Sequence, residues 1–585
     1  MAVVSFHFHG YQPGDVVRWL EPDPLRPQRF EERRSPVAHT IGGERVVGGN
    51  WTDAVLHAYG RMGTVLENVA GAASVDIEPQ TLVWLLERDA NAYRRALAAY
   101  EKGAAGFAIT PPFHAILPHH HALERAAMFD LMIDFFAPLL RRVQDRPIGL
   151  WLPEAAYSAE TMASYRDSAR RAMVDLEDLP DLAGGVHLLV DARQIEARSG
   201  SGNGWGRTEQ NLRFMARDPA LSGDFAFGVS KPAAFCGTMA ARAADSVLVA
   251  SDLESLLANP AQAERFAAIV ETLRSAGDRV AAPRPPEEAE AVRLVDFSSW
   301  SDYDDQLGSG HTSDTRWTGL RRWDGLVVAR DHRGQPLSQL WKHAFTLVTE
   351  QIETAVRRAA QHVLRNAGVQ RIPETLRSLT VAYGRHIFEA HYRACGFGRG
   401  DVDFAGAADR ILEGKVDVDL AGRLARGYLL MLMGLRSDPR FWDNPDTRVT
   451  FQNVALLSQA VVDLAEAARR LGDEERATKL LRMLRASVLE FPEAYERHAF
   501  GELLGLTGWE TTEAAWHASL QSDVPSRSAY DVVRRAALFA AAPAIRAQWP
   551  DFPLRAEEIA ADTGHIVGEV HGVWENKEWC EHRVA

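Results

Sequence analysis

Acidic side chains follow two short apolar segments that have the composition of buried strands. Glu154 ends the segment 148–154, and Asp252 and Glu254 come directly after the apolar segment 246–251. Two carboxylates at the carboxyl ends of separate strands are what an acid/base pair needs in order to cleave a glycosidic bond. Considered one at a time, each acid is also explained as an ordinary surface-loop residue.

Histidines form a second group of residues able to do chemistry. His7 and His9 lie two residues apart in the apolar segment 2–9, so on a strand both point to the same face. The pair suits the recognition of sugar hydroxyls or the ligation of a metal, and two imidazoles bound to the backbone explain it equally well. Three consecutive histidines at 119–121 cannot all converge on one ion from a regular helix or strand, which favours a solvated or helix-start position for them.

The elements that must position these residues alternate between strand and helix in the first half of the chain. Short apolar runs predict buried strands at 2–9, 148–153, 186–190 and 246–251. Apolar residues three and four apart predict helices at 80–102 and 122–143. Alternation of this kind is typical of an α/β domain with a largely parallel sheet or barrel. The Gly- and Ser-rich segment 199–206 predicts a flexible loop.

The second half of the chain has a different pattern. Long amphipathic helices are predicted at 338–367, 419–437, 447–471 and 473–490, with almost no strand-like alternation between them. We therefore expect two domains, an α/β domain at 1–335 and an all-α domain at 336–585. A chain of 585 residues also exceeds the roughly 250–300 at which a single hydrophobic core stops growing.

Composition excludes several classes of protein. The net charge of −14 has the wrong sign for a protein that works by neutralising phosphates, so nucleic acid is not an expected partner. The three cysteines are far apart and lack CxxC spacing, which argues against a disulfide framework and a structural zinc site. No stretch approaches the ~20 apolar residues of a membrane span, and the N-terminus does not have the pattern of a signal peptide. We expect a cytoplasmic protein that does not bind a membrane; its oligomeric state stays open.

Taken in order, five segments resemble glycoside hydrolase family 57. They are His7-Phe-His-Gly-Tyr-Gln-Pro13, Thr110-Pro-Pro-Phe-His-Ala-Ile-Leu-Pro118, Gly149-Leu-Trp-Leu-Pro-Glu154, 217–227 and Ala250-Ser-Asp-Leu-Glu254. The resemblance covers about residues 3–330. It extends more loosely into the helical half, which is similar to an uncharacterised branch of the family with a C-terminal helical domain.

The resemblance implies a fold and a mechanism. The fold is an incomplete (β/α)7 barrel, and the activity is retaining hydrolysis or transglycosylation of α-linked glucans, with no cofactor and no obligatory metal. Glu154 matches the family's nucleophile and Asp252 its general acid/base. We expect their carboxyl groups to lie roughly 5–5.5 Å apart, as suits a covalent intermediate. The expected substrate-binding residues are His7, His9, His114, Trp151, Arg217, Asp218, Glu254 and Trp300.

Two departures from the family pattern keep alternatives open. Leu253 stands where the family has glycine, and 255–259 lacks the aromatic residue and glycine that usually follow. A metal-dependent amidohydrolase or deacetylase that uses the His-x-His pair is one alternative, although it leaves Glu154 without a role. A degenerate barrel that binds glycans is another. Because both acids are present, we expect an active glycosidase.

Overall fold

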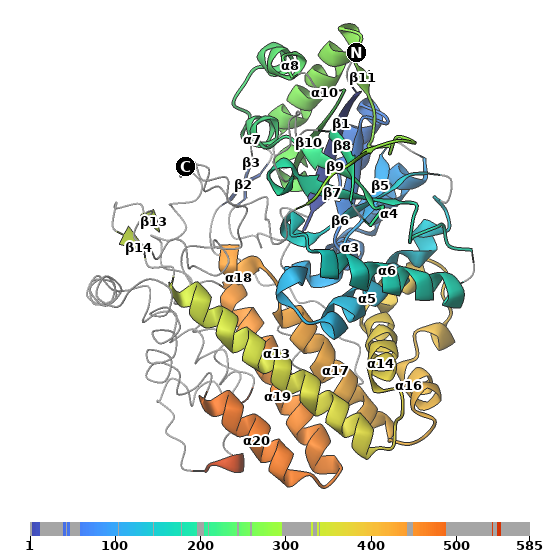
Figure 1. The fold of residues 1–585 in the computed structure, drawn as a ribbon, viewed down its shortest axis with the longest axis vertical. Helices are drawn as coiled ribbons and strands as arrows, with labels where there is room; N and C mark the ends of the chain where they lie inside the picture. The colour runs from blue at the N-terminus through green and yellow to red at the C-terminus, as the bar shows by residue number, and fades with distance from the viewer. Residues whose placement is uncertain are drawn as a thin grey trace. The chain divides into compact units, whose positions relative to one another are not determined.

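The computed structural model describes residues 3–11, 59–294 with short gaps, 340–441 and 448–486, together with a few shorter pieces (Figure 1). The chain divides into two compact units. One unit takes residues 1–14, 32–313 and 388–397, and the other takes the rest. The segment 388–397 thus belongs with the N-terminal unit although it follows residue 335 in the sequence. The expected domain boundary at 335 stays a prediction.

Seven parallel strands close into a barrel in the first unit. Each strand pairs with the next one around the barrel, and the last pairs with both its predecessor and the first. In order around the barrel they are β1 (Val3–Gly10), β4 (Ala73–Ile77), β5 (Gly106–Ile109), β6 (Ile148–Trp151), β7 (Val186–Asp191), β9 (Arg213–Arg217) and β10 (Ser246–Asp252). The predicted seven-stranded α/β barrel is confirmed.

Helices follow the barrel strands, as the alternation of the sequence predicts. They are α2 (Met62–Asn68), α3 (Pro79–Arg88), α4 (Ala90–Glu101), α5 (Ala122–Leu140), α6 (Ala159–Asp175), α7 (Pro219–Phe227), α8 (Pro232–Ala240), α9 (Leu253–Leu257) and α10 (Pro260–Ser275). The same unit takes α15 (Glu389–Ala394) from the later segment 388–397. The single helix expected at 80–102 is two helices. Asp89 separates them because its side chain accepts hydrogen bonds from the N–H groups of Asn91 and Ala92, which caps α4.

Short strands extend the sheet and form two small hairpins. They are β8 (Gly204–Arg207), β11 (Arg279–Val280) and β12 (Glu290–Ala291), and the hairpin pairs β2 (His39–Ile41) with β3 (Glu44–Val46) and β13 (Ala329–Arg330) with β14 (Pro336–Leu337). The end of the predicted loop 199–206 is therefore a strand, antiparallel to β9. Its Gly206 lies so close to Phe214 that a Cβ atom would overlap the phenyl ring. The residues 199–203 lie outside the described part of the chain.

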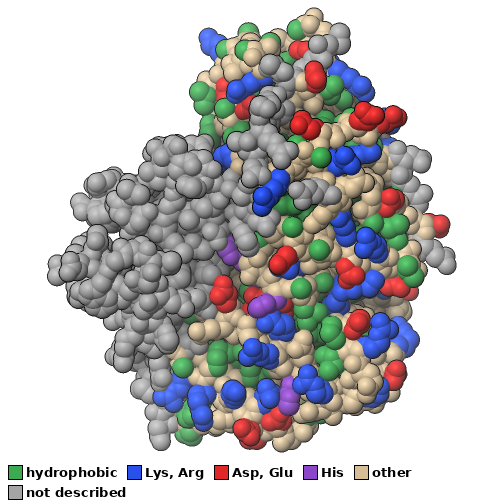
Figure 2. Space-filling model, viewed as in Figure 1, with side chains coloured by type: hydrophobic (Ala, Val, Ile, Leu, Met, Phe, Trp, Pro, Cys, Tyr) green, Lys and Arg blue, Asp and Glu red, His purple; other side chains and the backbone are tan. Residues whose placement is uncertain are grey.

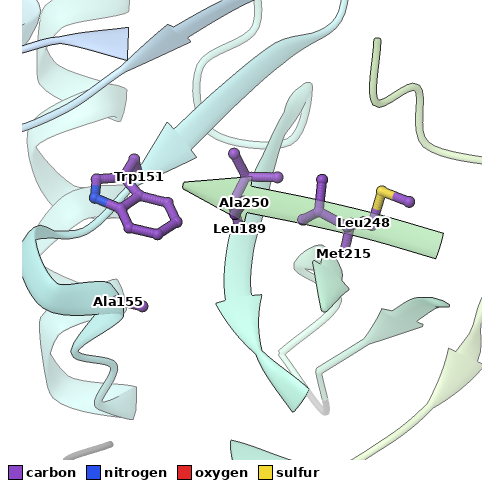
Figure 3. Packing of buried hydrophobic residues seen from close by; sticks show 6 residues of the cluster. All are labelled: Trp151, Ala155, Leu189, Met215, Leu248 and Ala250. Atoms are coloured by element: carbon purple, nitrogen blue, oxygen red, sulfur yellow. The ribbon is translucent and has the colours of Figure 1, made fainter. Parts of the chain in front are cut away.

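Strand β1 alternates between the inside and the outside of the barrel. Phe6 and Phe8 pack outward against the ring of Phe266, with centroids 5.0 and 5.3 Å away. His7 and His9 point inward, where both rings lie against Trp151. Figure 3 shows the apolar cluster that surrounds Trp151, formed with Ala155, Leu189, Met215, Leu248 and Ala250. The histidines of β1 thus lie inside the barrel, and its phenylalanines pack between the barrel and the surrounding helices.

The second unit is helical, as predicted. Its longer helices are α13 (Leu340–Asn366), α14 (Ile372–Ile387), α16 (Phe404–Leu412), α17 (Val418–Gly434), α19 (Arg448–Arg470) and α20 (Glu474–Leu484), with a short α18 (Asp438–Phe441). Helices α17 and α19 pack tightly, because Gly427 leaves no room for a Cβ beside Leu464. Arg426 and Asp463 form a buried bidentate ion pair between the same helices. Beyond Leu337 the described residues include no strand.

The surface of the described residues has mixed charge. Acidic and basic side chains are intermingled on the face shown in Figure 2. No helix among the described residues combines the length and the apolar run that a bilayer crossing needs.

Candidate active site

The carboxyl ends of the parallel strands gather the polar residues that the sequence singles out. His9 lies one residue before the end of β1 and is paired in register with Asp252 on β10 and with Asp76 on β4. His114 follows β5, and Glu154 follows β6. Parallel strands end at one rim of a barrel, which is where barrel enzymes place their catalytic groups. The structure therefore brings together acids and histidines as far apart in the sequence as His9 and Asp252.

Asp76 links the two histidines of β1. His9 Nδ1 lies 2.8 Å from Asp76 Oδ2, and His7 Nε2 lies 2.9 Å from Asp76 Oδ1. The other nitrogen of His7, Nδ1, is bound to Ser74 Oγ at 2.9 Å. All three ionisable side chains are buried. The Asp76 carboxylate thus fixes both imidazole rings within the barrel.

The charges in this cluster follow from the burial and the pairing. Burial opposes a charge on His9, but the nearby Asp76, Asp252 and Glu254 raise the pKa of His9 to about 9. Burial lowers the pKa of His7, against the opposing effect of Asp76. The pKa of Asp76 is lowered because its two imidazole partners outweigh its own burial. At neutral pH His9 is therefore the cation that balances the Asp76 carboxylate.

This charge state assigns the proton on His114. Charged His9 carries a proton on both ring nitrogens, so its Nε2–H donates to His114 Nε2 across 2.9 Å. His114 must accept there and carries its proton on Nδ1. That nitrogen lies 3.7 Å from Glu154 Oε1. A relay of two imidazoles thus directs an N–H toward the carboxylate of Glu154.

Glu154 occupies a strained turn. The N–H of Ala155 donates to the carbonyl of Leu152 at 2.8 Å, which closes a β-turn with Pro153 and Glu154 at its centre. Glu154 has φ 59° and ψ 15°, in the left-handed region where glycine or asparagine is usual. Such a conformation costs on the order of 1–3 kcal/mol for another residue and is typical of functional sites. Ala155 is left-handed as well, with φ 53°.

A matching turn carries His114 at the end of β5. Phe113 has φ 69° and His114 has φ 49°, so both residues are left-handed. Each of these two turns follows a proline and ends a barrel strand. Each turn thus contains two adjacent left-handed residues that are not glycine. They are Phe113 and His114 in one turn, and Glu154 and Ala155 in the other.

The left-handed backbone of Glu154 leads to a stability prediction. Glycine adopts this conformation without a steric cost, whereas the Cβ of alanine clashes. We expect Glu154→Gly to have a larger free energy of unfolding than Glu154→Ala, by about 1 kcal/mol, in urea denaturation. The matched control is Glu271, which is exposed on helix α10. There the order reverses, because glycine is less stable than alanine in a helix by about 1 kcal/mol. The same order at both positions would contradict the left-handed turn.

Asp252 ends strand β10 with a side chain that solvent reaches. Protein surrounds its carboxyl group on the other sides, and this desolvation raises the pKa of Asp252, against the opposing effect of His9 and Arg217. A raised pKa suits a group that must hold a proton to donate. The expected separation between the carboxyl groups of Glu154 and Asp252 stays a prediction.

The structure of the segment after Asp252 shows why leucine is accommodated where family 57 has glycine. Helix α9 begins directly at Leu253, whose side chain is fully buried. Its backbone is not left-handed, so no glycine is needed at this position. The next residue, Glu254, accepts a hydrogen bond from the buried hydroxyl of Tyr59. Residues 258–259 lie outside the described part of the chain.

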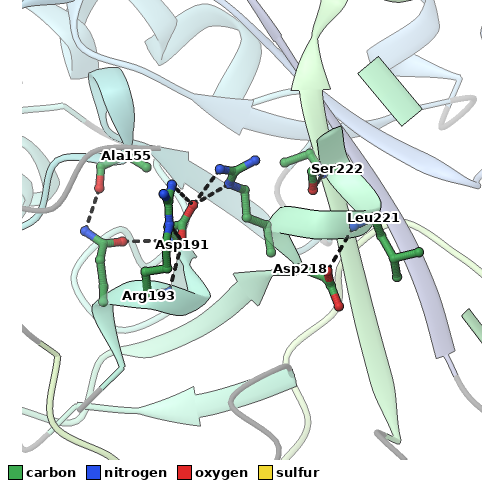
Figure 4. Close-up of polar contacts among 9 residues, drawn as sticks. Ala155, Asp191, Arg193, Asp218, Leu221 and Ser222 are labelled. Carbon is green, nitrogen blue, oxygen red and sulfur yellow. Dashed lines mark hydrogen bonds and ion pairs between the residues drawn. The ribbon is translucent and has the colours of Figure 1, made fainter. Parts of the chain in front are cut away.

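Arg217 and Asp218 are held mainly by protein groups. Arg217 binds Asp191 Oδ2 through Nε at 2.7 Å and Nη2 at 2.6 Å, and Asp191 is fully buried (Figure 4). Asp218 caps helix α7 by accepting from the N–H of Leu221 at 3.0 Å, and it pairs with Arg242. These contacts position the end of β9 and the start of α7. The roles of Arg217 and Asp218 in substrate binding stay predictions.

The structure describes one of the two tryptophans that are expected to stack on sugars, Trp151. The ring of Trp151 is fully buried, with centroid distances of 5.1 Å to His7 and 5.4 Å to His9. It therefore forms a wall behind the histidines, and its assignment as a sugar contact stays a prediction. Trp300 lies outside the described residues. Tyr11 stacks on His114 at 4.1 Å and presents an aromatic ring beside the relay.

Three residues of the site are not among the candidates that the sequence predicts. They are Asp76, Tyr59 and Asp191, each of which binds a candidate residue from a distant part of the chain. Asp76 and Asp191 share one signal, a lone acid near the end of a short apolar run. Among the described residues, no group of three or more His, Cys, Asp and Glu side chains is arranged to hold a metal ion.

Comparisons with known proteins cover the whole chain. Residues 1–312 match the family model described as maltose-forming alpha-amylase-like, N-terminal domain, and residues 316–554 match the model of the corresponding C-terminal domain. The crystal structure of an exo-type maltose-forming amylase from Pyrococcus sp. ST04 is 32% identical, covers 100% of both chains and has a TM-score of 0.79. No curated protein sequence matches the chain.

Structures of glycoside hydrolase family 57 are much less similar. A branching enzyme of that family from Thermococcus kodakaraensis is 10% identical, with a TM-score of 0.44 over 83% of this chain and 94% of its own. This likeness is too weak to assign the chain to family 57, so that membership stays a prediction.

Proposed function

The chain belongs to the maltose-forming alpha-amylase-like family, and we propose that it is a retaining glycoside hydrolase that releases maltose from the ends of α-linked glucans. The observation that carries the proposal is the full-length likeness to the exo-type maltose-forming amylase from Pyrococcus sp. ST04. Two carboxylates at strand ends of a closed barrel supply groups suited to this chemistry.

In the first step, Glu154 is the nucleophile. Its carboxylate attacks the anomeric carbon, the bond from that carbon to the glycosidic oxygen breaks, and Asp252 gives its proton to the departing oxygen. A covalent glycosyl ester on Glu154 results. The raised pKa of Asp252 supports its role as the acid, because a larger fraction of the group holds a proton at a given pH.

In the second step, Asp252 acts as a base. Its carboxylate takes a proton from water, the water oxygen attacks the anomeric carbon, and the bond to Glu154 breaks. Two inversions at one carbon retain its configuration. A sugar hydroxyl in place of water gives transfer instead of hydrolysis. The relay from His9 to His114 supports Glu154 as the nucleophile, because it keeps a donor N–H directed at the carboxylate.

The imidazoles of His9 and His114 and the aromatic ring of Tyr11 are suited to binding a sugar at the same rim. We propose that His114, and the charged His9 when it exchanges its bond to His114, donate to sugar hydroxyls when substrate is bound, with no metal and no cofactor required. The family 57 resemblance of five ordered segments supports the same residue roles. We also propose a catalytic domain at 1–335, a helical domain at 336–585 and a cytoplasmic location; the ranges of the two family models support the division.

The proposal is tested by the products that the wild-type protein forms. With maltooligosaccharides of defined length, we expect maltose from the earliest time points, released as the α-anomer and seen by proton NMR before mutarotation. Products of mixed length at early times would contradict release from chain ends. Initial β-maltose would contradict retention, and the absence of any turnover on α-glucans would contradict the function itself.

A further inference from the structure

A buried glutamine holds the left-handed turn of Glu154 from the next strand of the barrel. Gln194 lies in the short turn that follows β7, and its side chain is fully buried. Its Nε2 donates to the carbonyl of Ala155 at 2.7 Å, and its Oε1 accepts from the N–H of Asp191 at 2.7 Å (Figure 4). The turn is therefore bridged to the end of β7.

This bridge needs an amide in one orientation. The N–H of Asp191 is only a donor and the carbonyl of Ala155 is only an acceptor, so the side chain between them must accept at one end and donate at the other. If the amide of Gln194 were flipped, its NH2 group would face the N–H of Asp191 and its oxygen would face the carbonyl of Ala155, so both hydrogen bonds would be lost. A glutamate cannot donate to Ala155 when ionised, and methionine forms neither bond.

The far end of the bridge is itself anchored. Asp191 Oδ2 binds Arg217 on β9, and Asp191 Oδ1 accepts from the N–H of Arg193 at 2.9 Å. Burial opposes the charge on Asp191, but the Arg217 and Arg193 cations lower its pKa. Gln194 thus couples the turn of Glu154 to a charged network that spans the ends of two further strands.

A buried glutamate does the same for the turn of His114. Glu78 follows β4, the strand next to β5, and is fully buried. Its Oε1 accepts from the N–H of left-handed Phe113 at 2.8 Å, and its Oε2 accepts from the N–H of Thr81 at 2.9 Å, which caps helix α3. Both partners are donors, so both carboxylate oxygens must accept.

We propose that Gln194 and Glu78 are positioning residues, each holding the left-handed turn that presents Glu154 or His114. The inference rests on the proposed role of Glu154 and extends it to residues that touch no substrate. A strained backbone persists only where its surroundings determine it, and these two side chains bind the peptide groups beside the reacting carboxylate and its imidazole partner. Small displacements of a catalytic group have large effects on rate.

The first test replaces Gln194 with methionine and measures hydrolysis of maltooligosaccharides by the full chain. We expect kcat to fall between about 10- and 100-fold, with KM changed less than about threefold, because the turn is displaced while the other sugar contacts remain. The matched control is Gln262→Met. Gln262 is also buried and also donates to a backbone carbonyl, that of Phe225, on the outer helices.

A purely structural role gives a different result. In that case Gln194→Met loses thermal stability but keeps the kcat of the control when both are assayed well below their unfolding temperatures, and this outcome overturns the proposal. Gln194→Glu keeps the size of the side chain and the bond to Asp191, so it tests the same loss if the methionine variant does not fold. Adding Ala155→Gly, which favours a left-handed backbone, should recover part of the lost kcat.

The second test replaces Glu78 with glutamine. The amide must place its NH2 against the N–H of Phe113 or that of Thr81, so one bond is lost. We expect a loss of kcat that exceeds that of Asp417→Asn, a cap substitution on α17 in the helical unit. Equal kcat values would overturn the role of Glu78.

Failure of the proposed function itself gives a different result. In that case the wild-type chain does not turn over α-glucans, or Glu154→Gln retains the turnover.

Discussion

Replacing Glu154 with glutamine should reduce the turnover of α-glucans by at least about 1000-fold, because an amide has nearly the same shape as a carboxylate but cannot displace the glycosidic oxygen. The backbone turn and the neighbouring His114 do not require a charge at this position. Affinity for maltooligosaccharides, measured by calorimetry, should therefore stay within about tenfold of the wild type. This is the largest effect that we expect from any single substitution.

Glu160 provides the matched control. It is exposed in the first turn of helix α6, six residues after Glu154, and pairs with the buried Arg125. Glu160→Gln should leave kcat unchanged, because the exposed glutamine oxygen can still accept from Arg125, which also keeps its bond to the carbonyl of His120. Equal turnover by Glu154→Gln and the wild type would show that another group is the nucleophile.

Replacing Asp252 with asparagine should have an effect that depends on the leaving group. Hydrolysis of maltooligosaccharides should slow by about 100- to 10,000-fold, the usual contribution of a general acid. A maltosyl fluoride needs little protonation to depart, so formation of the glycosyl-enzyme from it should be much less affected. Rapid-quench measurement of the two substrates separates the steps.

The pH dependence of the wild type should reflect the same group. Because desolvation raises the pKa of Asp252, the proton is present below that pKa and is lost as the pH rises through it, so kcat/KM on maltooligosaccharides should fall on the alkaline side. The control is Asp245→Asn, at the opposite end of β10, where the side chain is exposed. An alkaline fall of the same shape in Asp252→Asn would assign the acid to another residue.

The sequence predicts four of the barrel strands from short, mainly apolar runs. The runs at 2–9, 148–153, 186–190 and 246–251 correspond to β1, β6, β7 and β10. Strands β4, β5 and β9 do not stand out by pattern, so closure into a seven-stranded barrel follows from the family resemblance and not from periodicity.

The candidate site was predictable only in part, for a physical reason. Glu154 and Asp252 are recognisable because each acid follows an apolar strand. Asp76, Glu78 and Gln194 act through partners that lie 35 to 67 positions away in the sequence. A lone polar residue has no spacing that reveals such a partner. The left-handed backbone at Glu154 is equally hidden, because neither glycine nor asparagine marks it.

The alternation along β1 has a consequence for how this protein tolerates change. Inserting or deleting one residue within Val3–Gly10 turns the imidazoles of His7 and His9 toward the helices and the phenyl rings of Phe6 and Phe8 into the barrel. The Asp76 carboxylate then loses its cation at the same time as the helices lose their aromatic contacts. Evolution can therefore vary the side chains of this strand one by one, but a change in its length damages the catalytic rim and the folding core in a single event.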